Sequence, residues 1–272
     1  MLSIAEPKDV VSRTALFYGT VVLVEGNRLF LSLHPEDDPP KHVIGLSGGK
    51  DSTALALRLN EVEPRDYEYI CNATGNELPE LFDHLTRMED LLGKPIKRVT
   101  YKTDLYGLIE EQNMIPNFRA RFCTRILKIE PTVNYFSSLP NNSWLYVGLR
   151  ADETLRRGLY GEEINVRFPM REWGWGESDV IEYLADKGVC VPRRTDCAVC
   201  PYQRLGEWRD LWLNHPQEYA KGVAIEERYG HTFRSAHRDN WPASLKELAE
   251  EFESGRPIRS YKQDGACRVC SL

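Results

Sequence analysis

The pattern of hydrophobic and polar positions divides the chain into a short β segment and a longer alternation of strands and helices. Between residues 16 and 33, short apolar runs surround Glu25-Gly26-Asn27-Arg28, where Gly and Asn suit a tight turn. A proline-rich acidic stretch over residues 35–40 follows and is typical of a linker. The pattern therefore predicts an N-terminal hairpin and linker over residues 1–40.

Apolar runs and amphipathic segments alternate along the next part of the chain. The expected strands cover residues 42–46, 67–72, 96–100 and 144–147, and the expected helices cover 52–60, 79–92, 105–112, 124–136 and 180–187. Strands separated by helices pair in parallel, so the pattern predicts an α/β fold with a doubly wound, mostly parallel sheet. We expect this nucleotide-binding domain to span residues 41–190 and a C-terminal cysteine-rich extension of helices and loops to span residues 191–272.

Composition limits the size and the partners of the protein. With 272 residues, of which 42% are hydrophobic, the chain can bury one core with extensions. It holds no apolar run of membrane-spanning length and its first residues lack the features of a signal peptide, so we expect no membrane partner and a cytoplasmic location. The net charge of -6 argues against nonspecific coating of nucleic acid but leaves room for a local anion site. Four cations occur without a carboxylate between residues 119 and 128: Arg119, Arg121, Arg125 and Lys128.

The most specific motif is Ser47-Gly48-Gly49-Lys50-Asp51-Ser52, between the first core strand and its helix. Two adjacent glycines allow a tight turn that brings backbone N–H groups close to an anion, and the helix N-terminus adds partial positive charge. The motif is not a Walker loop, because Ile44 stands where that motif needs glycine and Asp51 follows the lysine. The order of strand, glycine turn and helix favours a phosphate site over a simple turn with a serine cap.

This motif resembles the signature of the PP-loop superfamily, which includes ATP pyrophosphatases, thiolation enzymes and phosphoadenylylsulfate reductases. The resemblance implies a fold like that of the adenine nucleotide alpha-hydrolases. It also implies that Ser47, Gly48, Gly49, Lys50, Asp51 and Ser52 hold a pyrophosphate or sulfate group, with Lys50 and Asp51 in catalytic roles and with ATP and Mg2+ as cofactors. A cradle for pyrophosphate and Mg2+ would stabilise charge that develops in the transition state.

A second segment extends the resemblance beyond the loop. Residues 72–80 resemble the D-T-G-x-x-x-P-E segment of the reductases, with Asn72 where an acidic residue is frequent. The resemblance implies that Thr74 and Gly75 contact the nucleotide. With the two segments described next, the resemblance covers about residues 41–205.

Two further segments carry cations. Residues 121–131 resemble the reductase element C-C-x-x-x-K-x-x-P, with Phe122 in place of the first cysteine. This implies that Lys128 faces the nucleotide or its acceptor in a catalytic role. Residues 148–154 resemble a G-x-R-x-x-E-S element, in which Arg150 can bind phosphate oxygens bidentately and serve both binding and catalysis.

Two C-x-x-C pairs, Cys197 to Cys200 and Cys267 to Cys270, indicate metal or redox chemistry, because stable disulfides are rare in a reducing compartment. Four thiolates suit either Zn2+ or an iron–sulfur cluster, and free redox thiols are a third alternative. The resemblance favours a [4Fe-4S] cluster, because Cys123 lies in the element that holds cluster cysteines in adenylylsulfate reductases. The expected ligands are Cys123, Cys197, Cys200 and either Cys267 or Cys270. We expect Cys71 and Cys190 to be small buried side chains.

The aromatic residues of the C-terminal extension have two interpretations. They could stack on nucleic-acid bases, or they could pack the cysteine-bearing region against the core. The second is favoured because Trp208 and Trp212 fall on one helical face. The same packing role is predicted for the other two aromatic residues of this segment, Tyr219 and Trp241.

Two enzymatic functions fit these motifs. The first is an ATP pyrophosphatase that adenylates an acceptor oxygen for sulfur insertion, as in DNA phosphorothioation or tRNA thiolation, with nucleic acid and a sulfur donor such as a cysteine desulfurase as partners. The second is a sulfonucleotide reductase, although the chain lacks the terminal E-C-G-L-H element of that branch. A third hypothesis is a non-catalytic nucleotide-binding accessory protein. Under the first, nucleic acid would meet the cations of residues 119–128 and the arginines at 193, 194, 204 and 209. The oligomeric state, a homodimer included, stays open.

Overall fold

A computed structural model of the chain describes residues 38–156, 160 and 164–258, and the backbone of three short strands nearer the N-terminus. Those strands are β1 (Arg13–Phe17), β2 (Thr20–Glu25) and β3 (Arg28–Ser32), and they form an antiparallel sheet in the order β1-β2-β3. Glu25 pairs with Arg28, so β2 and β3 form the predicted hairpin, to which β1 adds a strand.

A five-stranded sheet, parallel throughout, forms the centre of the structure. Its order is β6-β5-β4-β7-β8. The strands are β4 (His42–Gly45), β5 (Tyr67–Cys71), β6 (Ile96–Arg98), β7 (Trp144–Tyr146) and β8 (Asn165–Arg167). The parallel pairing confirms the predicted α/β class. The chain adds strands first on one side of β4 and then on the other, so ligands are expected where the order reverses, between β4 and β7.

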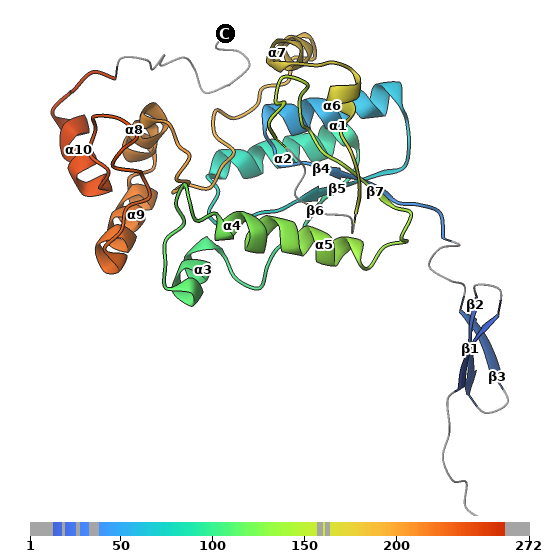
Figure 1. Cartoon of the computed structure of the whole chain (residues 1–272). Coiled ribbons are helices and arrows are strands. Elements are labelled where there is room, and N and C mark those ends of the chain that lie inside the picture. The colour runs from blue at the N-terminus through green and yellow to red at the C-terminus, as the bar shows by residue number, and fades with distance from the viewer. Residues whose placement is uncertain are drawn as a thin grey trace, which may run out of the picture.

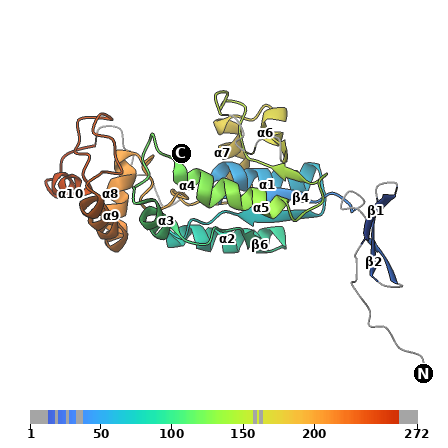
Figure 2. The same ribbon diagram turned by 60° about the horizontal axis from the view of Figure 1, so that its bottom comes forward.

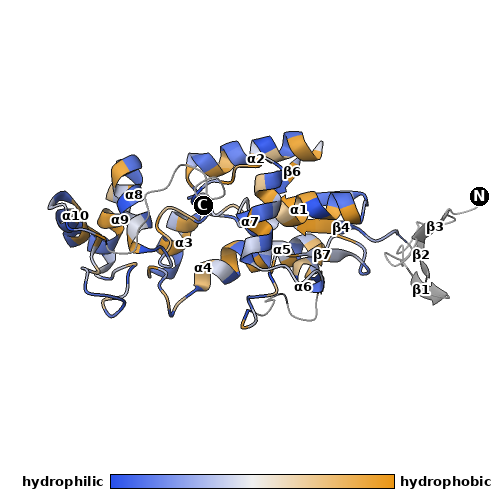
Figure 3. Cartoon of the chain, turned by 90° about the horizontal axis from the view of Figure 1, so that it is seen from above, coloured by the Kyte–Doolittle hydropathy of each residue, from blue (hydrophilic) through white to orange (hydrophobic). Residues whose placement is uncertain are grey.

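Helices cover both faces of this sheet (Figure 1). The helices α1 (Lys50–Val62), α2 (Pro79–Leu92) and α7 (Glu177–Asp186) pack on the face that carries Ile44, while α5 (Glu130–Phe136) packs on the face that carries Val43. Neighbouring residues of a strand point to opposite faces, which explains this division. Hydrophobic and hydrophilic residues alternate along α2, as expected of a helix with one buried side (Figure 3).

The C-terminal helices form a group at one end of the parallel sheet (Figure 2). They are α8 (Leu205–Asn214), α9 (Pro216–Tyr229) and α10 (Leu245–Glu253), and their core continues into α3 (Leu105–Gln112). Trp208 and Tyr219 are buried there, and the rings of Trp212 and Trp241 both pack against Phe252. The prediction that these aromatic residues serve packing is confirmed.

The helix predicted over residues 124–136 is irregular. It begins with α4 (Phe122–Thr124), widens into a π-helix over Arg125–Ile129 and continues as α5. Pro131 lacks the N–H that an α-helical turn would need at this point, which accounts for the widened turn. The short helix α6 (Pro169–Glu172) and strand β8 were not predicted. Among the described residues, no helix is both long enough and apolar enough to cross a membrane.

Candidate functional site

The phosphate loop, residues 47–52, connects the carboxyl end of β4 to α1. Gly48 has a φ of 77°, and a Cβ on it would lie 2.3 Å from Leu81 Cδ1, so the turn requires glycine. Ser47 Oγ lies 3.1 Å from Ser52 Oγ, which in turn donates to the Gly49 carbonyl at 3.1 Å. The loop is therefore a tight turn at a helix N-terminus, where backbone N–H groups and the helix dipole favour an anion.

Charged side chains form a connected series beside the loop. Lys50 Nζ lies 2.8 Å from Asp51 Oδ1 and 3.1 Å from Glu177 Oε1. Arg150 Nη1 donates to Asp51 Oδ2, and Arg150 Nε donates to Asp152 Oδ1, both at 2.9 Å. Burial alone would lower the pKa of Arg150, but Asp152 and Asp51 raise it, so the guanidinium stays charged. The structure thus brings together three residues that were predicted to be catalytic: Lys50, Asp51 and Arg150.

Gly148 lets the segment after β7 approach the phosphate loop. A Cβ on Gly148 would lie 3.0 Å from both the Asp51 carbonyl carbon and the Ser52 nitrogen. These atoms belong to the backbone of the first turn of α1 and cannot move aside without disturbing that helix. The close approach brings Arg150, two residues further along, to Asp51.

A buried histidine supports the phosphate loop. His84 of α2 places its Nε2 3.0 Å from Thr53 Oγ1, in the first turn of α1. Burial, together with the positive charge of Arg87, lowers the pKa of His84 to about 4, so the ring is neutral at pH 7. A single histidine in an amphipathic helix carries no motif, so the sequence did not mark His84, and only the fold brings it beside Thr53.

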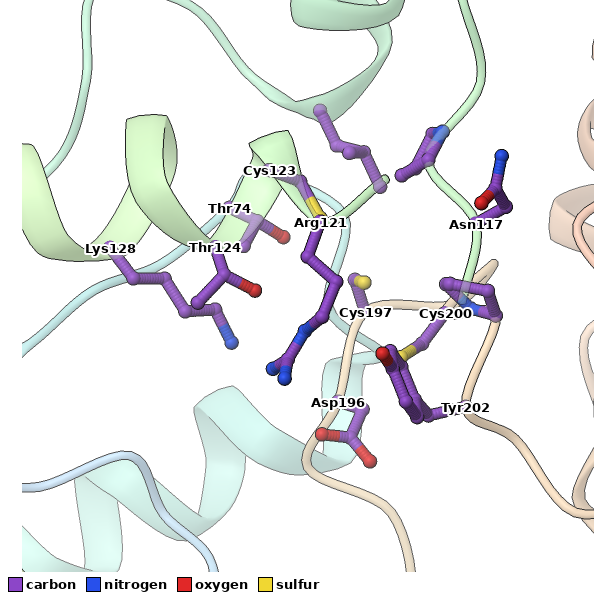
Figure 4. A pocket seen from close by; sticks show the side chains of 13 residues that line it. Thr74, Asn117, Arg121, Cys123, Thr124, Lys128, Asp196, Cys197, Cys200 and Tyr202 are labelled. Carbon is purple, nitrogen blue, oxygen red and sulfur yellow. The ribbon is translucent and has the colours of Figure 1, made fainter. Parts of the chain in front are cut away.

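Three of the predicted cysteine ligands meet in one pocket (Figure 4). Cys123 belongs to α4, and Cys197 and Cys200 belong to the loop before α8. The pocket encloses about 160 Å³. We call it the thiol pocket; its polar lining also includes Thr74, Asn117, Arg121, Thr124, Lys128, Asp196 and Tyr202.

The thiols and Lys128 influence one another's ionisation. Hydrogen bonding to Cys200 and burial raise the pKa of Cys197, while the same hydrogen bond lowers the pKa of Cys200. Burial and the charge of Cys200 raise the pKa of Cys123. Burial opposes a charge on Lys128, but the attraction of Cys197 and Asp196 raises its pKa overall. Cys200 is therefore the thiol that ionises first, next to a lysine that remains a cation.

The thiol pocket adjoins the phosphate loop. A Cβ on Gly49 would lie 3.4 Å from Thr195 Oγ1, and Cys197 follows Thr195 by two residues. Two residues span at most about 7 Å of backbone. The Cα of Cys197 therefore lies within about 7 Å of the Cα of Thr195, the residue that lies beside the phosphate loop. An antiparallel bridge between Glu77 and Cys197 fixes the cysteine segment against the loop after β5.

Thr74 and Gly75, predicted to contact the nucleotide, form the turn after β5. Their backbone N–H groups donate to the Glu77 carboxylate at 2.7 and 3.1 Å, and Thr74 Oγ1 donates to it at 2.6 Å. Thr74 also lines the thiol pocket. The turn therefore stands beside the thiols.

The arginines that were expected to face nucleic acid differ in their surroundings. Arg194 is buried, and its guanidinium donates to Gln203 Oε1 at 2.7 Å and to the Cys197 carbonyl at 2.9 Å. For Arg194 the prediction is wrong, because this side chain is buried and hydrogen-bonds to the backbone of the cysteine loop. Arg193 lies 3.5 Å from Asp210, whereas Arg204 is exposed at the start of α8.

The remaining described cysteines differ in their burial. Cys71 is buried, as predicted, but Cys190 is exposed, so the prediction of its burial is wrong. Cys267 and Cys270 lie outside the described residues, and the complete predicted ligand set is not described. Within the part of the chain that the structure describes, no three histidine, cysteine, aspartate or glutamate side chains are arranged to hold a single metal ion, and this finding includes Cys123, Cys197 and Cys200.

Several solved structures resemble this chain. One is phosphoadenylyl-sulfate (PAPS) reductase from Candida auris in a phosphate complex, with 13% identity and a TM-score of 0.44 over 56% of this chain and 75% of that chain. Another is the U34-tRNA thiolase NcsA from Methanococcus maripaludis with its [4Fe-4S] cluster, with 16% identity and a TM-score of 0.42 over 87% and 80% of the two chains. A third is the NH3-dependent NAD synthetase from Campylobacter jejuni subsp. jejuni NCTC 11168 in complex with the nitrate ion, with 12% identity and a TM-score of 0.41 over 83% and 92%.

A family model gives the more decisive comparison. A search of curated proteins found no match. The model of the phosphoadenosine phosphosulfate reductase domain, however, matches residues 41–209, which is more than half of the chain and includes both the phosphate loop and the thiol pocket. The chain therefore belongs to the phosphoadenosine phosphosulfate reductase domain family.

Proposed function

We propose that this protein is an ATP pyrophosphatase that adenylates an acceptor oxygen so that sulfur can replace that oxygen. The observation that carries the proposal is the adjacency of the phosphate loop and the thiol pocket. Thr195 lies against Gly49 of the loop, and Cys197 of the pocket follows two residues later. One half of the site suits a leaving pyrophosphate, the other half suits sulfur, and a single acceptor can reach both.

The phosphate loop would serve the first step. ATP would enter as its Mg2+ complex, with its β- and γ-phosphates on the N–H groups of residues 47–52 and on Lys50. A lone pair of the acceptor oxygen attacks the α-phosphorus, the bond from that phosphorus to the bridging oxygen breaks, and pyrophosphate leaves with the electron pair. Lys50 and Arg150 are already oriented by Asp51, so they can stabilise the developing charge with little rearrangement.

The thiol pocket would serve the second step. A sulfur atom at the oxidation level of sulfide, held in the pocket, attacks the carbon or phosphorus atom that carries the adenylated oxygen. The bond from that atom to oxygen breaks, and AMP leaves with the electron pair, so the step consumes no oxidant or reductant. Lys128 is a cation among the thiols and would stabilise both the sulfur anion and the departing phosphate.

We further propose that Cys123, Cys197 and Cys200 are three ligands of a [4Fe-4S] cluster, with Cys267 or Cys270 as the fourth. The donor set fits, because thiolates are the usual ligands of such clusters and each iron takes its own cysteine. When bound, the cluster would fix the cysteine segments in position and supply a redox-active iron–sulfur group beside the site of sulfur transfer. Zinc on the same thiols is the alternative. Iron and acid-labile sulfide analysis of protein purified without oxygen distinguishes the two, and Cys200→Ser should lower the bound iron.

The family match supports a second candidate, a sulfonucleotide reductase. In that reaction a thiolate attacks the sulfur of an adenylylsulfate, the bond from that sulfur to the phosphate oxygen breaks, and the nucleotide leaves with the electron pair. The product is a cysteine S-sulfonate, from which a second thiol releases sulfite. In this candidate Cys200 would act as a free thiolate and not as a cluster ligand, because its pKa is lowered from that of an ordinary thiol.

Turnover by the anaerobically purified full chain separates these functions. The protein is incubated either with ATP and a nucleic-acid acceptor or with an adenylylsulfate and a thiol reductant. Release of pyrophosphate supports the adenylating enzyme, and release of sulfite supports the reductase. Nucleotide binding without either product would contradict both and favour a non-catalytic accessory role. Cys200→Ser is a useful control, because it should spare pyrophosphate release but abolish sulfite release.

A further inference from the structure

The outer rim of the thiol pocket carries a tight turn between α3 and α4. Asn117 Oδ1 accepts the N–H groups of Arg119 and Ala120 at 2.9 and 3.0 Å, and the Asn117 N–H donates to the Ala120 carbonyl at 3.2 Å. These bonds fix the two central residues, Phe118 and Arg119, at the tip of the turn. Asn117 lines the pocket (Figure 4), so the tip of the turn, which follows Asn117 directly in the chain, lies at the pocket's edge.

Two aromatic side chains are exposed at this rim. Phe118 is 59% exposed, and Tyr202 is 42% exposed although it lines the pocket. The ring centroids are 6.2 Å apart, and the Tyr202 hydroxyl donates to the Phe118 carbonyl at 3.1 Å. An exposed phenylalanine forgoes the stabilisation of burial, and aromatic rings are a common source of contact area at binding surfaces. Tyr202 thus holds Phe118 in place while most of the Phe118 ring remains open to a ligand.

The rim is also cationic. The guanidinium carbon of Arg121 lies 4.9 Å from the centre of the Tyr202 ring, and Arg119 is exposed at the tip of the turn. Among the residues that the structure describes, neither arginine forms an ion pair with a carboxylate. Asp196 brings a negative charge into the pocket itself. Lys128 brings a positive charge there as well, so the pocket holds charges of both signs, whereas both exposed arginines at the rim can bind phosphate groups.

We infer that this rim binds single-stranded nucleic acid by stacking an unpaired base on Phe118, with the flanking phosphates on Arg119 and Arg121. Aromatic rings that stack on bases, next to cations that follow the backbone, are the features by which proteins hold single strands. Bases of a duplex are stacked on one another, so the rim favours strands with an unpaired base. The inference rests on the proposed function and names its acceptor class: an unpaired nucleotide held beside the thiols.

Fluorescence anisotropy of a short labelled oligonucleotide tests this binding directly. The full-length chain should bind the single strand more tightly than a hairpin duplex of the same sequence, and added salt should weaken the binding. Phe118→Ala should weaken single-strand binding about tenfold, the order expected for one lost stack, and Phe118→Trp should retain it. Leu91→Ala is the matched control, because Leu91 is 58% exposed at the far end of α2 and should not affect binding.

Equal single-strand affinity of the wild type and the Phe118→Ala variant would overturn the inference, as would a preference for the duplex. Pyrophosphate release from ATP, measured on the same preparations, separates this result from the proposed function. Release without any Phe118-dependent binding would remove the inference alone. Phe118-dependent binding without release would support the stacking site and count against the proposed reaction.

Discussion

Asp51 accepts a hydrogen bond from Arg150 at 2.9 Å, although the two residues are 99 positions apart in the chain. The same carboxylate contacts Lys50, so one acidic side chain orients two cations at the phosphate loop. The contact lies where the strand order reverses between β4 and β7. A nucleotide phosphate bound there would meet cations that are oriented in advance.

Arg150→Lys should lower kcat/KM for pyrophosphate release by about 10- to 100-fold, because an ammonium cannot contact Asp51, Asp152 and a phosphate in the same planar geometry. Steady-state kinetics with ATP measures the effect. Arg156→Lys is the matched control, since Arg156 is exposed and pairs with Glu153. Equal kinetics of the Arg150→Lys variant and the wild type would show that Arg150 serves structure alone.

Gly148→Ala should destabilise the protein by about 1–3 kcal/mol, because the new methyl group would press on the backbone of Asp51 and Ser52. The same displacement should weaken ATP binding. Urea denaturation and ATP titration measure the two effects. Gly45→Ala is the control: a Cβ on Gly45 would meet the Tyr146 carbonyl oxygen at an ordinary 3.7 Å. A Gly148→Ala variant that matched this control in both measurements would contradict the proposed close packing.

Lowering the pH from 7 to 5 should cost about 2 kcal/mol of stability through His84. Burial lowers its folded-state pKa to about 4 from an ordinary 6.5, so between these values the unfolded chain binds a proton that the folded chain does not. The stability is complete above pH 6.5 and is lost as the pH falls toward 4. Urea denaturation at several pH values should show this loss in the wild type and a smaller one in His84→Gln. Identical pH profiles would contradict the prediction.

Glu226 of α9 should produce the opposite dependence. It is 6% exposed and accepts N–H groups from Phe233 at 2.9 Å and Leu245 at 2.6 Å. Burial nevertheless raises its pKa to about 7 from an ordinary 4.5. The folded chain therefore holds a proton that the unfolded chain releases in this window, and raising the pH from 5 to 8 should cost about 2 kcal/mol. Glu226→Gln should remove this loss in urea denaturation, and a loss that persisted unchanged in the variant would contradict the assignment to Glu226.

Sequence alone predicted the features that depend on contiguous residues. The phosphate loop is one turn between one strand and one helix, so its motif determines its shape. The α/β class follows from the alternation of strands and helices. The convergence of Cys123 with the Cys197 pair was implied by the family resemblance, and the structure places these three cysteines in one pocket.

The features that sequence could not supply depend on contacts between distant segments. Nothing local distinguishes Arg194, which is buried under the cysteine loop, from an arginine that faces nucleic acid. His84 acquires its role only when α2 packs beside α1. Strand β8 has three residues and no apolar alternation, and it forms because its backbone pairs in parallel with β7. The π-helical turn over Arg125–Ile129 arises from the backbone around Pro131.

The affinity for ATP of the wild type and of Lys50→Met tests the central claim, that a nucleotide phosphate binds at residues 47–52. Isothermal titration should show at least about a tenfold loss for Lys50→Met, because a buried, charge-assisted contact to phosphate is removed. Lys94→Met, which changes a partly exposed lysine paired with Asp66, should bind ATP as the wild type does. Unchanged ATP affinity in a folded Lys50→Met variant would contradict the account.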